Sequence, residues 1–415
     1  MSKKLTIGLF GYGCVGKGLY EVLQRTPSIN ATVKLICVKD KLKARDLPSS
    51  YFTYNKFDIL NNPEIDVVVE LIDNADEAFE LVKYALEKGK AVVTANKKML
   101  ANHFKTLTTL AQQKNVPLLY EASVGGSIPI IRSLEEYYNT DTLSSVEGIL
   151  NGTTNYILTK TLQEQKSYQA VLKEAQDLGF AESNPTMDVQ AFDPKFKLVI
   201  LLAHAFGLIV QPDEILNSGI EQLSSYDIQY AREKGYRIKL IAQAVQQDDG
   251  ISAFVLPRFV LPNDVFYEVN NEFNAVQVSA AFSDKQLLTG KGAGSFPTAA
   301  AVLSDIAALG YNYSYEHKKI SRLKQTVALN NSIVINIYLR YTNDSIFEEL
   351  TFESVSEEFR SKKYKYIIGR IALSELVKAK LNTRTDVFVA QIVAPIKKFT
   401  QEVSADSRTV LASIH

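Results

Sequence analysis

Short apolar runs alternate with amphipathic segments through about the first 125 residues of the chain. The apolar runs predict strands, and the segments with an apolar residue at every third or fourth position predict helices. We expect strands at 4–10, 33–40, 65–72, 90–96 and 116–124, and helices after the first strand, at 77–89 and around 104–115. This alternation predicts an α/β, Rossmann-type domain with a doubly wound parallel sheet.

Such a sheet binds its ligand at the carboxyl ends of its strands. Polar residues follow several of the predicted strands at these ends, namely Asp73, Asn74, Thr94, Asn96, Lys97 and Glu121. We therefore expect the chemistry of this domain to lie along that edge.

Beyond Glu121 the regular alternation stops, and residues 236–262 read as two strands about an Asp-Gly turn. A second glycine loop at 290–295 then feeds an apolar helix, which indicates a return to the first domain. We predict a dinucleotide-binding domain at 1–128 rejoined by 298–325, an α+β substrate and dimerisation domain at 129–297, and a small α+β domain at 326–415.

The first strand runs directly into "GYGCVGKG", in which Gly11, Gly13 and Gly16 have the spacing of a dinucleotide-binding turn. Glycines let the backbone approach a pyrophosphate, and the free N–H groups of the next helix attract its charge. We expect Cys14 and Val15, inside this turn, to contact the cofactor as well. A tight turn between strand and helix is the simpler alternative.

The second strand ends in Lys39 and Asp40, which makes the choice between NADP and NAD depend on one side chain. An acidic residue there binds the ribose hydroxyls of NAD, whereas a basic residue favours the 2′-phosphate of NADP. Lys39, with further basic residues at 41, 43 and 45, favours NADP, and NAD stays open.

Overall charge and composition point to a small-molecule partner. Among 415 residues, 46 Lys and Arg balance 46 Asp and Glu, so no net charge indicates nucleic acid or an anionic membrane. Two cysteines and four scattered histidines do not suggest a transition-metal site.

The start of the chain lacks the features of a signal peptide, and the apolar run at 196–210 is too short to span a bilayer. We therefore expect a cytoplasmic protein.

Residues 184–207 begin as a polar loop and become a very apolar helix, with Asp193 and Lys197 one turn apart at its start. A structural interpretation makes Asp193 the helix N-cap, Pro194 the first helical residue and Gly207 the C-terminal stop. A chemical interpretation uses the i, i+4 pair, because a carboxylate on the same helix face can hold an ammonium group in place.

Five segments in order make the chain resemble the homoserine dehydrogenases over about residues 4–325. They are "VVTANKKML", "YEASVGGSIPIIRSL", "EGILNGTTNYILT", "DLGFAESNPTMDVQAFDPKFKL" and "GKGAGSFPTAAAVLSDI". The resemblance implies reduction of L-aspartate 4-semialdehyde to L-homoserine with hydride from NAD(P)H. It also implies a role in threonine and methionine biosynthesis.

The resemblance assigns roles to individual residues. It makes Lys197 the proton donor beside Asp193, places Lys97 between cofactor and substrate, and gives the substrate amino group to Glu182. It lines the substrate pocket with Asn151, Gly152 and Thr153, and places Gly294 near the cofactor. Asp188 is a further carboxylate available to the substrate, and we expect Asn74 and Thr94, at the ends of their strands, to contact the cofactor. The resemblance also implies a monovalent cation such as sodium at Glu121 and the backbone of Val124, Gly126 and Ile128.

One departure and two alternatives accompany this resemblance. Many relatives carry two glycines where this chain has "LIDNAD", so that loop departs from the pattern. The alternatives are another NAD(P)-dependent reductase of an amino-acid precursor and a cofactor-binding sensor without catalysis. The residues suited to an amino-acid aldehyde argue against the first, and the presence of Lys97, Asp193 and Lys197 argues against the second.

The C-terminal 90 residues resemble an ACT domain in their expected succession of elements. We predict strands at 332–342, 363–373 and 386–395, with a helix at 344–361. The turn "RYTNDSIFEEL" lacks the Pro and Gly with which such domains usually hold an effector. We therefore expect a degenerate effector site, weak inhibition by threonine, and a structural or dimer-supporting role in a homodimer or higher homo-oligomer.

Overall fold

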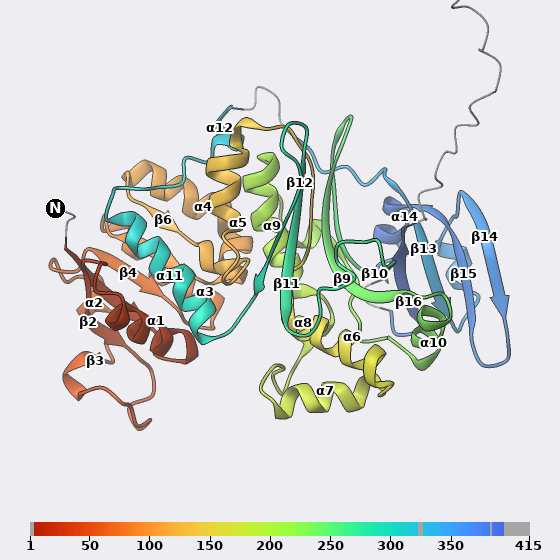
Figure 1. The fold of residues 1–415 in the computed structure, drawn as a ribbon. Helices are drawn as coiled ribbons and strands as arrows, with labels where there is room; N and C mark the ends of the chain where they lie inside the picture. Colours follow the sequence, from red (N-terminus) through yellow and green to blue (C-terminus); the bar gives the residue numbers. More distant parts are fainter. Residues whose placement is uncertain (1–3, 323–326, 382–383, 394–415) are drawn as a thin grey trace, which may run out of the picture.

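The computed structural model describes residues 4–322, 327–381 and 384–393, which form two sheets (Figure 1). The first sheet has six parallel strands in the order β3-β2-β1-β4-β5-β6. Its strands are β1 (Leu5–Phe10), β2 (Ala31–Cys37), β3 (Phe52–Thr53), β4 (Val67–Glu70), β5 (Ala91–Thr94) and β6 (Leu118–Leu119). The predicted Rossmann-type sheet is confirmed.

Helices from two separate parts of the chain cover this sheet. Those from the N-terminal part are α1 (Cys14–Arg25), α2 (Phe57–Leu60), α3 (Ala75–Glu87) and α4 (Lys97–Lys114). The late helix α11 (Ser295–Leu309) returns and packs against α1, as Figure 1 shows. The last predicted strand is shorter than expected, because Glu121–Ser123 turns into a 3₁₀ helix directly after β6.

The second sheet contains ten strands, in the order β12-β11-β7-β9-β10-β16-β13-β15-β14, with β8 also paired to β10. The bounds are β7 (Leu143–Ile149), β8 (Leu216–Asn217), β9 (Arg237–Gln247), β10 (Gly250–Val260), β11 (Phe273–Ala280), β12 (Asp284–Lys291), β13 (Val334–Tyr341), β14 (Ser354–Arg360), β15 (Lys365–Ala372) and β16 (Val387–Ile392). The predicted strand pair about Asp249 and Gly250 is confirmed as β9 and β10, which run antiparallel.

The remaining helices lie around this second sheet. They are α5 (Ile130–Arg132), α6 (Gly152–Glu164), α7 (Tyr168–Asp177), α8 (Thr186–Val189), α9 (Phe192–Phe206), α10 (Ser225–Glu233), α12 (Lys318–Arg322), α13 (Ile346–Glu349) and α14 (Leu373–Lys378). Helix α9 contacts both α4 of the first domain and strands of the second sheet. It therefore joins the two halves of the molecule.

The C-terminal region continues the second sheet. Strand β16 pairs in parallel with β10, so Arg258 lies opposite Gln391 and Phe259 opposite Ile392. Figure 1 shows the C-terminal strands β13, β14 and β15, drawn in blue, on the far side of the molecule from the red N-terminal part of the chain. The order of the elements, β13-α13-β14-β15-α14-β16, is that of a small α+β sandwich, and three of its strands were predicted.

The helix predicted at 344–361 is wrong. Helix α13 ends at Glu349, and Ser354–Arg360 forms β14 along the edge of the sheet. Pairing with β15 prevails over the local helix propensity of this segment. The ring of Phe359 on β14 also stacks on that of Tyr366 on β15, which adds a side-chain contact to the pairing of the two strands.

The predicted domain boundaries at 128 and 297 stay predictions, and the one at 325–326 lies outside the described residues. Both β-sheet hydrogen bonds and an ion pair join the C-terminal strands to the preceding part of the chain. The Arg340 guanidinium donates from Nε to both Asp227 oxygens at 2.9 and 3.0 Å, and from Nη2 to the Gln222 carbonyl at 2.5 Å. Asp227 is fully buried and also accepts from the Tyr338 hydroxyl.

Replacing Arg340 with Met should therefore lower the free energy of unfolding by roughly 3–5 kcal/mol, since it leaves the Asp227 charge buried without its partner. Urea denaturation measures the loss. The matched control is Arg370→Met, because Arg370 and Glu353 form an exposed ion pair at 3.7 Å and should change stability by less than about 1 kcal/mol. Equal small losses in both variants would contradict this account of the Arg340 contact.

Candidate active site

Helix α9 begins differently from the sequence-based expectation. Ala191, in the left-handed conformation at φ +65°, is the residue before the helix, and Asp193 is the second residue inside it. Asp193 is therefore not the N-cap, and its carboxylate is free to bond side chains from other segments. Gly207, at φ +67°, closes the helix as predicted.

The Asp193 carboxylate is held between two lysines. Its Oδ1 lies 2.7 Å from Lys97 Nζ, and its Oδ2 lies 2.9 Å from Lys197 Nζ. Lys197 also donates to the Leu150 carbonyl at 2.6 Å and is only 7% exposed, whereas the Lys97 side chain is 41% exposed. Two ammonium groups thus share one buried carboxylate, one of them enclosed and the other open to the surface.

The surroundings separate these groups electrostatically. Burial alone raises the pKa of the Asp193 carboxyl, but the ammonium groups of Lys197 and Lys97 outweigh burial and hold that pKa well below its usual range. Burial lowers the pKa of Lys197 despite the attraction of Asp193. The Asp193 charge raises the pKa of Lys97. Lys197 is consequently the one that releases its proton more readily.

Asn151 connects this ionic cluster to helix α6. Its Oδ1 accepts from the Thr154 N–H and so caps α6, while its Nδ2 donates to Asp193 Oδ2 at 2.9 Å and to Asp188 Oδ1 at 2.7 Å. Burial, together with the negative Asp193, raises the pKa of Asp188. The structure therefore brings Lys97, Lys197, Asp193, Asp188 and Asn151 together in one place.

The remaining predicted substrate residues lie around this cluster with fewer contacts. Gly152 is the first residue of α6, and Thr153 donates to the Phe180 carbonyl at 2.7 Å. Glu182 is exposed in the loop between α7 and α8, and its charge contributes to the raised pKa of Lys97. The structure thus places Glu182 within electrostatic reach of Lys97 and gives it no direct hydrogen bond to the cluster.

The glycine turn has the geometry that a nucleotide requires. Gly11 has φ +94°, and a Cβ at Gly16 would lie 2.4 Å from the Gly11 carbonyl, so both positions need glycine. Gly13 precedes α1 and faces open space. Cys14 is exposed and Val15 is half-buried in the first turn of the helix. Open space before free helical N–H groups suits a phosphate.

Residues far along the chain complete this edge. Gly294, at φ +120°, precedes α11, and the next residue, Ser295, donates to the Cys14 carbonyl at 2.8 Å. Lys39 at the end of β2 is exposed and forms an ion pair with Glu77 in the first turn of α3. Asp40 accepts the N–H groups of Leu42 and Lys43, so its carboxylate shapes the loop.

The ends of β4 and β5 carry one residue that the sequence analysis did not select. Glu70 is fully buried, accepts from the Thr94 hydroxyl at 2.5 Å, and accepts from the Ile72 N–H at 2.7 Å. Asn74, predicted to contact the cofactor, caps α3 by accepting from the Glu77 N–H. A carboxylate at the end of a run of valines was the available signal for Glu70.

The segment predicted to hold a cation contains a buried network. The Glu121 carboxylate accepts from the N–H groups of Ile131 and Arg132 at 2.9 and 2.7 Å. The Arg132 guanidinium donates to Asp305, which in turn accepts from the Glu121 N–H. Burial and the nearby Asp305 raise the pKa of Glu121 to about 8. Val124 and Ile128 are buried in the following turn, and Gly126 there has φ +58°.

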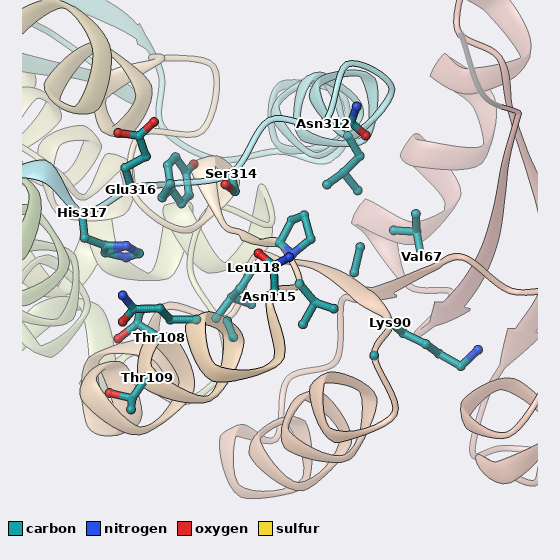
Figure 2. Close-up of a pocket in the computed structure, with 18 of the residues that line it drawn as sticks. Val67, Lys90, Thr108, Thr109, Asn115, Leu118, Asn312, Ser314, Glu316 and His317 are labelled. Atoms are coloured by element: carbon teal, nitrogen blue, oxygen red, sulfur yellow. The ribbon is translucent and has the colours of Figure 1, made fainter.

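A large open hollow of about 1190 Å³ lies at the opposite edge of the first sheet (Figure 2). Residues from the amino ends of the strands line it, with Thr108 and Thr109 of α4 and the segment around His317. It is remote from the glycine turn, because the two lie at opposite ends of the strands. We therefore place the candidate site at the carboxyl ends of the strands, where the polar side chains converge. The large hollow lies at the amino ends of the strands and is not part of that site.

Two further findings concern the described parts of the chain. No cluster of three or more His, Cys, Asp or Glu side chains suited to a metal ion occurs in residues 4–322, 327–381 and 384–393. None of the helices described there is both long and apolar enough to cross a membrane.

Glu70 generates a prediction about pH. Burial raises the pKa of Glu70 to about 7 from an ordinary value of 4.5. A carboxyl group with a raised pKa stabilises the folded state fully below pH 4.5, and this stabilisation is lost as the pH rises through about 7. The loss amounts to up to roughly 3 kcal/mol. Glu70→Gln should remove this pH dependence and make the protein more stable at pH 8.

Urea denaturation at pH 5 and pH 8 checks this expectation. The control is Glu87→Gln, because Glu87 is exposed at the end of the same domain's helix α3 and should leave the pH dependence unchanged. A Glu70→Gln variant with the pH dependence of the original protein would show that Glu70 does not titrate as described.

Comparison with known proteins agrees with this geometry. The family model described as "Homoserine dehydrogenase, NAD binding domain" matches residues 11–121, and the model described as "Homoserine dehydrogenase" matches residues 129–307. The chain is 38% identical over 319 residues to a homoserine dehydrogenase of Bacillus subtilis, covering 75% of this chain and 74% of that protein.

Solved structures extend the match to the C-terminal region. A homoserine dehydrogenase from Thiobacillus denitrificans superposes with a TM-score of 0.81 at 32% identity, covering 94% of this chain and 98% of that one. A hyperthermophilic archaeal homoserine dehydrogenase in complex with NADPH has a TM-score of 0.65 at 25% identity, covering 75% and 99% of the two chains. With its Rossmann-type sheet and its shared length, the chain belongs to the homoserine dehydrogenase family, whose members are oxidoreductases.

Proposed function

We propose that this protein reduces the aldehyde of L-aspartate 4-semialdehyde to the alcohol of L-homoserine, with NADPH as its preferred reductant. The observation that carries the proposal is the buried Asp193 carboxylate held between Lys97 and Lys197. A carbonyl that gains hydride needs a proton for its developing alkoxide, and an amino-acid substrate needs charged groups to hold it. This cluster supplies both kinds of group.

Lys197 is the proposed proton donor. A bound nicotinamide nucleotide supplies the hydride, so the chain has to supply the proton. Lys197 Nζ is held by Asp193 and the Leu150 carbonyl, and burial lowers its pKa, so the ammonium is both fixed in position and readier to give up its proton. A proton from solvent restores the ammonium after each turnover.

Lys97 and the surrounding residues are proposed to hold the substrate. Lys97 begins α4 at the carboxyl end of β5, and its raised pKa keeps the ammonium charged to attract the substrate carboxylate. Glu182 is proposed to bind the substrate amino group. Asn151, Gly152, Thr153 and Asp188 are proposed to line the pocket, since Asn151 bonds both Asp188 and Asp193.

The proposed preference for NADP depends on Lys39. Its ammonium is exposed at the end of β2, where the 2′-phosphate of NADP would lie, and Glu77 is its present partner. The neighbouring Asp40 is engaged with the loop N–H groups of Leu42 and Lys43, which leaves it less suited to the ribose of NAD. Gly11, Gly13, Gly16, Asn74, Thr94 and Gly294 are proposed to line the rest of the nucleotide site.

A monovalent cation such as sodium is proposed at Glu121. Two buried carboxyls, Glu121 and Asp305, face the one guanidinium of Arg132, and burial raises the pKa of Asp305 to about 6. This arrangement is short of one positive charge when both carboxyls are ionised. A cation bound by Glu121 and the carbonyls of Val124, Gly126 and Ile128 would supply it with the oxygen ligands that hard cations accept.

A homodimer is proposed from the outer edge of the second sheet. Strand β12 ends that sheet. Exposed apolar side chains lie on β12, in the turn before it and on the neighbouring β11, namely Leu287, Phe282 and Phe273. Apolar groups on an unpaired edge strand favour association with a second copy. The cytoplasmic location stays a prediction from the sequence.

The C-terminal domain is proposed to be structural, with a degenerate effector site. Its strand β16 continues the substrate-domain sheet through β10, and Arg340 bonds Asp227 across the same junction. In the turn after β13, the Asn343 side chain accepts from the Ser345 N–H, which occupies a backbone donor that an effector would need.

Lys197→Ala should reduce turnover by roughly a hundredfold or more, the effect of losing a general acid, and should leave NADPH binding nearly intact. An NADPH oxidation assay with aspartate semialdehyde, combined with fluorescence titration of NADPH, measures both quantities. The control is Lys195→Ala, because Lys195 is buried on the same helix but donates to Asn217 instead of Asp193. Near-normal turnover of Lys197→Ala would rule out its role.

Lys39→Ala should weaken NADPH binding more than NADH binding, because only NADPH carries the 2′-phosphate. Glu77→Gln should have the opposite effect and tighten NADPH binding, since it releases the Lys39 ammonium from its ion pair. Dissociation constants for the two nucleotides measure the preference. Equal effects of Lys39→Ala on both nucleotides would show that Lys39 does not read the phosphate.

Threonine at physiological concentrations should barely inhibit the enzyme, because the C-terminal turn lacks an open backbone for an effector. Titration of threonine into the NADPH oxidation assay tests this expectation. Strong, saturable inhibition that disappears when the chain is truncated after residue 325, with activity retained, would contradict it.

A further inference from the structure

Asn274 on β11 is fully buried, and both polar atoms of its side-chain amide lack a hydrogen-bond partner. It is the one side chain within the described ranges that leaves two buried polar atoms unpaired. Unpaired buried polar groups destabilise a fold and are uncommon in native proteins, so each one calls for an explanation.

A second buried amide, that of Asn155 on α6, is fully bonded, and α6 packs against the strand that carries Asn274. Asn155 on α6 donates to the carbonyls of Val269 and Phe273, both at 3.0 Å, and its Oδ1 accepts from the buried Lys239 ammonium. The fold thus provides hydrogen-bond partners for the buried Asn155 amide on the adjacent helix α6. Poor packing of the whole region does not explain the unpaired atoms of Asn274.

Asn274 lies between the two ligand-binding segments. A Cβ at Gly292 would come within 1.8 Å of Asn274 Nδ2, so the glycine loop that leads to Gly294 passes directly over the amide. On the other side, a Cβ at Gly152 would lie 3.6 Å from Asn274 Oδ1 and 2.7 Å from the Glu272 carbonyl. The amide therefore lies against the proposed nucleotide loop and close to the start of the proposed substrate helix.

The same loop is connected to the glycine turn of the first domain. Two residues after Gly292, Gly294 precedes α11, and Ser295 bonds the Cys14 carbonyl. On its other flank, Lys291 and Ser127 exchange hydrogen bonds with each other. A small shift of the loop at Gly292 is easy because glycine adopts many backbone conformations, and such a shift would carry backbone groups toward or away from Asn274.

We infer that Asn274 is a positioning residue that couples nucleotide binding to substrate binding through the Gly292 loop. In this structure the donor and the acceptor of the Asn274 amide have no hydrogen-bond partner. When both ligands are bound, the backbone of the 292–294 loop and the start of α6 settle on the amide and pair it. Each ligand then favours the arrangement that the other needs, which makes their binding mutually supportive.

This inference takes the proposed nucleotide and homoserine sites as given, and its test separates the two. NADPH and L-homoserine are both the reduced partners of the reaction, so they bind together without turnover. We expect saturating homoserine to tighten NADPH binding to the original protein by about fivefold or more, the usual lower range of coupling between sites. Fluorescence titration of NADPH, with and without homoserine, measures this factor.

Asn274→Leu keeps the size of the side chain and removes both polar atoms. We expect the coupling factor to fall to about one, with binding of NADPH alone changed by less than about twofold and thermal stability equal or higher. Asn274→Asp, which replaces the donor by an acceptor, provides a second variant if the first does not fold, and it should lose most of the coupling. The control is Gln277→Leu on the same strand, which should keep the original factor.

Retention of the original coupling in folded Asn274→Leu or Asn274→Asp would overturn the inference and indicate that the amide is only structural. Absence of coupling in the original protein would overturn it as well. Failure of the original protein to bind NADPH at all would contradict the nucleotide site itself, and the titration without homoserine identifies that outcome separately.

Discussion

Burial of one carboxylate, that of Asp193, fixes the arrangement of the candidate active site. A charged carboxylate that is 3% exposed requires partners of opposite charge and hydrogen-bond donors, because water cannot reach it. Those partners come from three places: Lys97 at the start of α4, Asn151 at the start of α6, and Lys197 on α9 itself. The requirement to satisfy one buried charge thus holds the starts of α4, α6 and α9 in a single geometry.

The same charge gives the two lysines different properties. Lys97 is open to the surface and next to the negative group, so it stays protonated, whereas Lys197 is enclosed and its pKa is lowered by burial. A family oxidoreductase that reduces an amino-acid aldehyde needs both a fixed cation and a proton donor. In the proposed reaction, one carboxylate with two unequal lysines would meet both needs.

Continuity of the second sheet has a related consequence for the C-terminal region. Because β16 pairs with β10, the last domain shares main-chain hydrogen bonds with the strands that support the substrate side, and Arg340 adds a buried ion pair. The C-terminal strands and β10 are therefore parts of one continuous sheet. The presence of the C-terminal region bears on the stability of the catalytic part.

The sequence by itself predicted the parallel sheet, the glycine turn and the strand pair about Gly250, because periodicity and motif spacing are local properties. Its resemblance to a family singled out Asp193, Lys97 and Lys197 as candidate site residues, and the structure brings these three side chains together. The sequence did not determine the N-terminal boundary of α9, since the left-handed Ala191 leaves no local signal, or β14, whose strand form depends on pairing with β15. Glu70 and Asn274 were likewise not selected from the sequence, because their importance arises from burial. Only the tertiary structure decided these points, because it alone sets which residues far apart in the chain enclose a given polar group.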